Sequence, residues 1–169
     1  MANASAIHVA DTGLFVAMGQ PTNPRYRAVR SFARKHNLTF VIPESVYDEL
    51  TVHEEGLRSP PIDMAIEENF VEIADTLDYT NSLVSRTMDG VRRYIANADD
   101  RHEDEIERAD TALAGVIAQA FDTGKAPEAY VYTTDIVAGE GIETIFRSHG
   151  FEEEVTFVNA FQLIEDLLD

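Results

Sequence analysis

The segment AIHVADTGLF, residues 6–15, determines how the rest of the chain is interpreted. It opens with a short apolar run typical of a buried strand, and that run ends at Asp11. No residue of opposite charge lies near Asp11 in the sequence. A carboxylate beside a buried strand costs free energy unless hydrogen-bond donors or a cation compensate it. Asp11 is therefore either the cap of a following helix or a ligand of a positive ion.

Short apolar runs alternate with amphipathic segments along the whole chain. We expect strands at residues 6–10, 39–42, 71–74, 130–133 and 155–158. We expect helices at residues 24–36, 44–53, 81–97, 103–122, 136–149 and 159–168. This alternation predicts an α/β fold whose central parallel sheet, of about four or five strands, is covered by helices on both faces.

A length of 169 residues suits one domain, so we expect a single domain over residues 1–169. The segment HEEGLRSPPID, residues 53–63, contains a glycine and two adjacent prolines and is expected to be a loop. Together with the helix at 81–97, it makes the middle of the chain mostly helical. Residues 54–100 are therefore interpreted as a helical elaboration of the domain.

The charge balance of the chain is strongly acidic. There are 31 acidic residues against 13 Lys and Arg, for a formal net charge of −18, and only Lys35 and Lys125 are lysines. Such self-repulsion is relieved by salt, because the Debye length falls to about 3 Å near 1 M. We expect a halophilic protein from a cytoplasm with molar salt, with an ordinary acidic protein as the alternative. The charge argues against a general attraction to nucleic acid.

Several protein classes are excluded by composition. The chain has no cysteine, which excludes disulfides and thiolate metal sites. No apolar stretch approaches the roughly 18 residues that span a bilayer, so no membrane association is expected. The N-terminus lacks a basic segment followed by a long apolar one, which leaves a cytoplasmic location as the expectation.

Three further acids have positions that suit a common site with Asp11. Asp135 follows the strand expected at 130–133, so both aspartates project from one sheet edge if their strands are parallel neighbours. Asp110 falls in the apolar stripe of its helix, and Glu49 lies at the boundary of another apolar face. Taken singly, Asp11 and Asp135 could be helix caps. Likewise, Asp110 could pair with an arginine, and Glu49 could be solvated.

Four carboxylates at one sheet edge would have a specific chemistry. Each pair at about 4 Å would repel by roughly 4 kcal/mol at an effective dielectric of about 20. Without a cation, one or more of them would hold a proton through a raised pKa. Oxygen ligands without histidine or cysteine favour Mg²⁺ or Mn²⁺ over zinc. One or two such ions can hold a phosphate, activate a water and stabilise a leaving oxygen.

The basic residues concentrate in NPRYRAVRSFARKHN, residues 23–37, which holds five of the 13 Lys and Arg. Arg27, Arg30 and Arg34 share one face of the expected helix and are candidates for binding RNA phosphates. The alternative is a solvated face that pairs with surface acids or stabilises the end of its own helix.

The motifs VADTGLF, PESVYDEL, ERADTALAGVIAQA and VYTTD, in this order, resemble those of PIN-domain nucleases, including the VapC-type toxin ribonucleases. The resemblance covers about residues 6–165. It implies a three-layer α/β/α sandwich, to which the pattern of this chain adds the extended helical middle section. It also implies an endoribonuclease that depends on Mg²⁺ or Mn²⁺ and hydrolyses RNA phosphodiester bonds.

The resemblance also assigns roles to individual residues. The four catalytic and metal-binding acids would be Asp11, Glu49, Asp110 and Asp135. Thr12 matches the small hydroxyl residue beside the first acid, and Thr133 matches the hydroxyl two positions before the last. A homodimer and an antitoxin-like protein inhibitor are further implications. The segment between Glu49 and Asp110 is longer than in compact toxins of this family, so the protein has either a toxin–antitoxin role or an RNA-processing role. The alternative to an enzyme is a PIN-like module that binds RNA or protein without turnover.

Overall fold

The computed structural model describes residues 5–52 and 60–169. Within these residues, five strands form one parallel sheet in the order β3-β2-β1-β4-β5. The strands are β1 (Ile7–Ala10), β2 (Phe40–Ile42), β3 (Val71–Ile73), β4 (Ala129–Thr133) and β5 (Val155–Asn159). Each agrees with an expected apolar run to within one residue at either end, so the expected parallel sheet is confirmed.

Helices connect all the strands. The helices are α1 (Thr12–Met18), α2 (Pro24–Lys35), α3 (Glu44–Thr51), α4 (Pro61–Glu67), α5 (Ser82–Asp99), α6 (Arg108–Asp122), α7 (Ile136–Ser148) and α8 (Ala160–Leu168). Five of them, α2, α3, α5, α7 and α8, match expected segments to within two residues at each end. Across the described ranges, no helix has the length and apolar character that crossing a bilayer requires.

The start of α6 differs from the expected helix. Residues 103–105 form a separate 3-10 turn, and α6 begins only at Arg108. Ile106 between them has an extended backbone, with φ −80° and ψ 123°, and its side chain is buried. Burial of Ile106 thus interrupts what the sequence presents as one helical pattern.

The predicted loop at 53–63 is wrong at its C-terminal end, because α4 begins at Pro61. Proline suits the first position of a helix, where the backbone N–H has no intrahelical partner to lose. Residues 53–59 of the predicted loop lie outside the described residues. Helix α1, which begins directly after Asp11, had no range assigned from the sequence.

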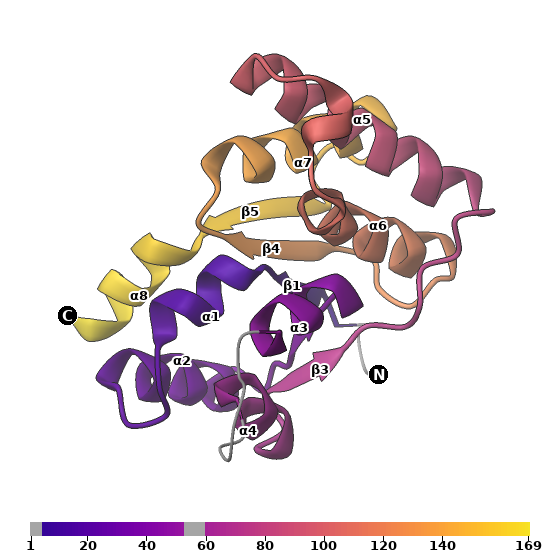
Figure 1. Cartoon of the computed structure of the whole chain (residues 1–169). Coiled ribbons are helices and arrows are strands. Elements are labelled where there is room, and N and C mark those ends of the chain that lie inside the picture. The colour runs from indigo at the N-terminus through magenta and orange to yellow at the C-terminus, as the bar shows by residue number, and fades with distance from the viewer. Residues whose placement is uncertain (1–4, 53–59) are drawn as a thin grey trace.

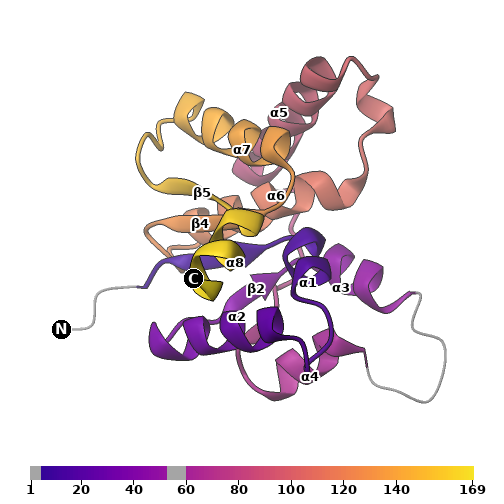
Figure 2. The same cartoon turned by 90° about the vertical axis from the view of Figure 1, so that its left-hand side faces the viewer.

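The sheet is the middle layer of three (Figures 1 and 2). Figure 2 shows α5, α6 and α7 on one side of the strands and α1, α2 and α4 on the other. Successive side chains of a strand point to opposite faces of the sheet, so each strand contributes to two hydrophobic cores. In β1, Val9 packs against the first group of helices and Ala10 against the second. The three-layer α/β/α sandwich is therefore confirmed.

Strand β1 lies at the centre of the sheet and determines where a site can form. It pairs with β2 on one side and with β4 on the other, with Ala10 opposite Tyr132. Because these strands are parallel neighbours, the chain leaves both at the same edge of the sheet. Asp11 and Asp135 therefore follow adjacent strand ends, as predicted.

Candidate active site

Asp11 is the N-cap of α1, and both of its carboxylate oxygens accept hydrogen bonds. Its Oδ1 accepts from the backbone N–H of Thr12 at 2.7 Å, and its Oδ2 accepts from the hydroxyl of Thr133 at 3.0 Å. These bonds favour the charged form, but burial outweighs them, and nearby Glu49 and Asp135 add repulsion, so the pKa of Asp11 is raised. The helix cap anticipated from the sequence is real, yet it leaves the negative charge incompletely compensated.

Thr133 links the two aspartates at the ends of β1 and β4. Its side chain is fully buried, at 0% exposure. Its hydroxyl donates to Asp11 and accepts from the backbone N–H of Asp135 at 3.0 Å. Asp135 in turn caps α7, because its Oδ1 accepts from the N–H of Ala138 at 3.1 Å. One hydroxyl therefore fixes the relative position of two acids from separate segments.

Replacing Thr133 with valine keeps the side-chain shape and removes this link. We expect the free energy of unfolding to fall by about 1–3 kcal/mol, because the N–H of Asp135 loses its buried partner. If these acids hold a divalent ion, we also expect Mn²⁺ affinity to fall about 10–100-fold, as is usual when a group that orients metal ligands is lost. Calorimetry of Mn²⁺ binding and thermal melting measure both effects. Thr133→Ser retains the hydroxyl and is the matched control, so equal losses in both variants would contradict the proposed link.

Glu49 reaches the site from α3 on the other side of Asp11. Its Oε2 accepts a hydrogen bond from the hydroxyl of Thr12 at 2.6 Å, which ties α3 to the first turn of α1. The side chain is only partly exposed. Glu49 also contributes to the raised pKa of Asp11, so its charge acts on the site rather than on bulk solvent alone.

Asp110, the third residue of α6, has the largest carboxylate shift of the four acids. Burial raises its pKa to about 6, and the charges of Asp11, Asp135 and Glu107 contribute further in that order. The side chain is partly buried rather than enclosed in the apolar stripe. In the described part of the chain, no Lys or Arg forms an ion pair with any of the four acids, so the arginine anticipated as a partner of Asp110 is not found there.

Glu107 is a member of this group that was missed in the sequence. It is the N-cap residue of α6, its carbonyl accepts from the N–H of Asp110 at 3.1 Å, and its charge acts on Asp110. In the sequence it belongs to a dense acidic run and nothing distinguishes it from its neighbours. Only the break before α6 indicates that it begins the helix instead of lying within it.

The carboxylate oxygens of the four acids are the type of ligand that a hard divalent cation prefers, but their side chains are not arranged around a common point. Within residues 5–52 and 60–169, no three His, Asp or Glu side chains lie close enough together to hold a metal ion. Asp11 and Asp135 are held toward backbone N–H groups as helix caps, and like charges also drive carboxylates apart. Oxygen-only ligands and the raised pKa values of Asp11 and Asp110 nevertheless fit Mg²⁺ or Mn²⁺, whose charge relieves the repulsion.

The basic face of α2 is largely neutralised within the protein. Glu68, which follows α4, accepts from Arg30 at 2.8 Å and from Arg34 at 3.4 Å, and Tyr26 donates to the same carboxylate at 3.1 Å. Of the three arginines expected to bind RNA, Arg27 is exposed and has no ion pair with a described residue. For Arg30 and Arg34, the structure thus favours the alternative of pairing with a surface acid over binding of RNA phosphates.

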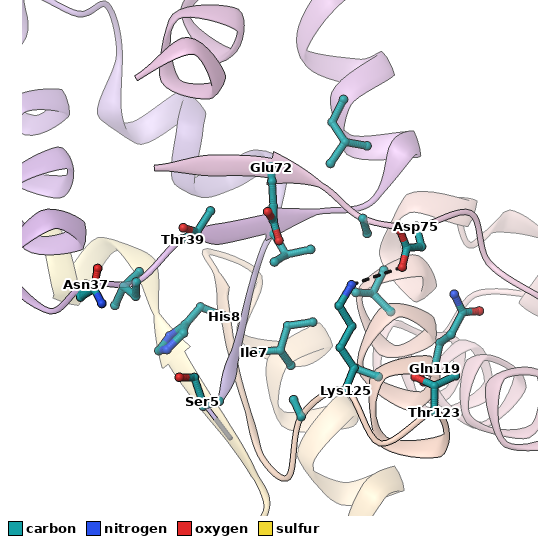
Figure 3. A pocket seen from close by; sticks show the side chains of 18 of the residues that line it. Ser5, Ile7, His8, Asn37, Thr39, Glu72, Asp75, Gln119, Thr123 and Lys125 are labelled. Carbon is teal, nitrogen blue, oxygen red and sulfur yellow. Dashed lines mark hydrogen bonds and ion pairs between the residues drawn. The ribbon is translucent and has the colours of Figure 1, made fainter. Parts of the chain in front are cut away.

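A large hollow in the described structure lies away from the acids. It has a volume of about 670 Å³ and lies between the start of β1, strands β2 and β3, and the C-terminal half of α6. Figure 3 shows Lys125 and Asp75 facing each other there, with their charged atoms 3.2 Å apart. None of the four acids lines this hollow. Size alone therefore does not identify the active site.

Residues 4–169 match the family model described as Halobacterial PIN domain. The chain belongs to this family, which confirms the resemblance to PIN domains and agrees with the acidic, lysine-poor composition expected of a halophile. PIN domains are in general nucleases and typically use divalent metal ions, and a nuclease must bind nucleic acid. A comparison with curated proteins gives no match.

Proposed function

We propose that this protein is an endoribonuclease that uses Mg²⁺ or Mn²⁺ to hydrolyse RNA phosphodiester bonds. The observation that carries the proposal is that acids from different segments meet: Thr133 bonds both Asp11 and the backbone of Asp135, and the charges of these two acids add to burial in raising the pKa of Asp110. Such coupling costs stability in the free protein and has no cationic partner among the described residues. Strongly perturbed acids in one place are typical of functional sites.

Asp11, Glu49, Asp110 and Asp135 are the residues that would hold the ion. When bound, the ion supplies Lewis acidity for the scissile phosphate and lowers the pKa of an attacking water. Asp110 gives up its proton as a cation enters, so binding should release protons below about pH 6. Thr133 orients Asp11 and Asp135, and Thr12 orients Glu49. The net reaction adds one water across a P–O bond, with its proton passing to the departing ribose oxygen.

Asp11→Asn tests the proposed activity. We expect the variant to lose Mn²⁺-dependent cleavage of single-stranded RNA by a factor of about 10³ or more in high salt, because one ligand charge is removed. The fold should survive, since asparagine is as good a helix cap as aspartate. Cleavage is measured by gel electrophoresis, and folding by circular dichroism. Cleavage by the variant at the rate of the parent would exclude Asp11 from catalysis.

A second function is a PIN domain that binds RNA or protein without turnover. The absence of a ready-made metal ligand set in the described residues favours it. Thermal melting distinguishes the two, because a specific metal site raises the midpoint by mass action at millimolar Mg²⁺ or Mn²⁺. The reference is a monovalent salt of matched ionic strength. An unchanged midpoint would support the module without turnover.

A further inference from the structure

A second hollow, of about 570 Å³, adjoins the acids directly. It lies between α1, α3, the start of α4 and the residue before α6. Two of its lining residues, Thr12 and Glu49, are also the hydrogen-bonded pair of the candidate site. The remaining walls are mostly apolar and are formed by Phe15, Val16, Leu50, Val52, Pro61 and Ile62. A ligand held by the acids could therefore extend into this hollow.

The apolar walls include side chains that solvent reaches freely. Val16 is 69% exposed and Val52 is 63% exposed, the highest values among the large apolar side chains of the described residues. They come from different helices and line the same hollow. Single exposed apolar residues are ordinary, but a contiguous apolar patch in a concave setting indicates a binding site.

The polar lining restricts what such a site can bind. Glu49 and Glu107 contribute carboxylates and Gln20 contributes an amide, while no Lys or Arg is found among the described residues that line the hollow. Two carboxylates repel an anion, so a phosphate is a poor occupant. A flat, neutral group that carries N–H donors on its edge suits apolar walls and carboxylate acceptors together.

We infer that this hollow is a subsite for an unpaired nucleobase beside the phosphodiester that is cleaved; the inference rests on the proposed function. We name it the base slot, bounded by Thr12, Phe15, Val16, Glu49, Leu50, Val52 and Glu107. If the acids hold the scissile phosphate, the attached nucleoside lies within one nucleotide of them, and the slot begins at Glu49. Bases in single strands are commonly splayed out and held by stacking against side chains.

The slot also accounts for how so acidic a protein could hold RNA. An uncharged base is not repelled by the surrounding carboxylates, so apolar contact with the walls of the slot would replace the phosphate contacts that basic proteins use. Glu107 can accept a hydrogen bond from the exocyclic amino group of cytosine, adenine or guanine, as carboxylates do with cytosine. Uracil has no such group. We therefore expect cleavage beside an amino-bearing base to exceed cleavage beside uracil.

The test compares slot variants with a matched surface variant in the full-length protein. Val16→Ser and Val52→Ser should each raise the KM for a single-stranded RNA about 5- to 20-fold with little change in kcat, because apolar contact with the base is weakened before the chemical step. Glu107→Gln should change which base flanks the cut, as determined by sequencing of products from a randomised RNA. Leu168→Ser removes another exposed apolar side chain, at 48% exposure on α8 and outside the slot, and should change neither value.

A binding measurement separates failure of the slot from failure of the proposed function. An RNA containing 2-aminopurine is titrated in the presence of EDTA, where no metal-dependent cleavage occurs, and its fluorescence should rise when the base leaves the stack of its neighbours and enters the slot, whose exposed walls are aliphatic. If the parent protein does not cleave RNA but the rise in fluorescence is lost in Val16→Ser and kept in Leu168→Ser, the slot stands and the nuclease proposal fails. If the parent cleaves, and the slot variants match Leu168→Ser in KM and base preference, the slot is overturned and a protein side chain becomes its better occupant.

Discussion

Replacing Asp110 with asparagine is expected to make the metal-free protein more stable and to abolish its response to divalent ions. The pKa of Asp110 is raised to about 6, so its charged form is disfavoured in the folded protein. A shift of about two units corresponds to about 3 kcal/mol, which partial solvent exposure reduces to about 1–2 kcal/mol. Asparagine removes the charge and therefore this cost. A residue that stabilises the protein when it is removed is best explained by a function that requires it.

The raised pKa of Asp110 also determines how the free energy of unfolding should change with pH. Between about pH 4 and pH 6 the folded protein retains the proton of Asp110 that the unfolded chain has already lost. The stability contributed by this group is therefore greatest at low pH and falls as the pH rises through about 6. Asp110→Asn should be indistinguishable in stability near pH 4 and more stable at pH 7.5, by about 2–4 °C in Tm for each kcal/mol.

Melting curves in EDTA and in 5 mM Mn²⁺ at constant high salt measure both halves of this prediction. The parent should gain Tm with Mn²⁺, by about 2.7 kcal/mol in free energy at a hundredfold excess over Kd, and the variant should not. Asp122→Asn, at the C-terminal end of the same helix, removes an equal charge far from the acids and is the control. If Asp110→Asn keeps the Mn²⁺ response of the parent, Asp110 is not a ligand.

The second large effect is the loss of the fold in dilute buffer. The net charge of −18 spreads over one small domain, and two like charges 10 Å apart in water repel by about 0.4 kcal/mol before screening. At 0.1 M salt the Debye length is about 10 Å, so many such pairs act together, and their sum is on the order of several kcal/mol. That is comparable to the whole stability of an ordinary domain. We expect cooperative unfolding as KCl is lowered from about 3 M toward 0.1 M.

Circular dichroism during dialysis from high to low KCl measures this transition. Replacing Asp104 and Glu105, two exposed acids of the 3-10 turn without an ion pair to a described residue, with asparagine and glutamine together should move the midpoint to lower salt without touching the four site acids. A non-ionic osmolyte of equal osmolality should not replace KCl if screening is responsible. A midpoint that is the same in parent and variant would show that charge repulsion does not govern the requirement for salt.

Most of the fold could be predicted from the sequence, because buried positions recur with the period of a strand or a helix. All five strands were found since each is a short apolar run, and the parallel sheet follows from the helices between them. The errors in the predicted elements arose where one local sequence pattern is compatible with two different structures. Pro60 and Pro61 precede and open a helix instead of marking a loop, and the apolar segment after Asp11 merges with its strand and hides α1. Ile106 is buried as its apolar spacing suggests, but its backbone is extended and lies before α6, which the helical pattern did not reveal.

The candidate site was predicted less completely than the fold. Placing Asp11 and Asp135 on one edge required only that β1 and β4 be neighbours, which the structure confirms. The resemblance indicated Thr133 as a hydroxyl residue near Asp135, but its hydrogen bonds to both Asp11 and the backbone of Asp135 are seen only in the structure. The pairing of Arg30 and Arg34 with Glu68 joins segments far apart in the chain, so helical spacing could not reveal it.

The central position of β1 has a consequence during synthesis on the ribosome. The first strand is translated early, but it stays incomplete until β4, near the other end of the chain, emerges to pair with it. Asp110 and Asp135 also leave the exit tunnel late, so a nascent chain carries only part of the acid group. Under the proposed function, a chain still in synthesis would lack Asp110 and Asp135 and would therefore not cleave the transcript or the ribosomal RNA beside which it is made.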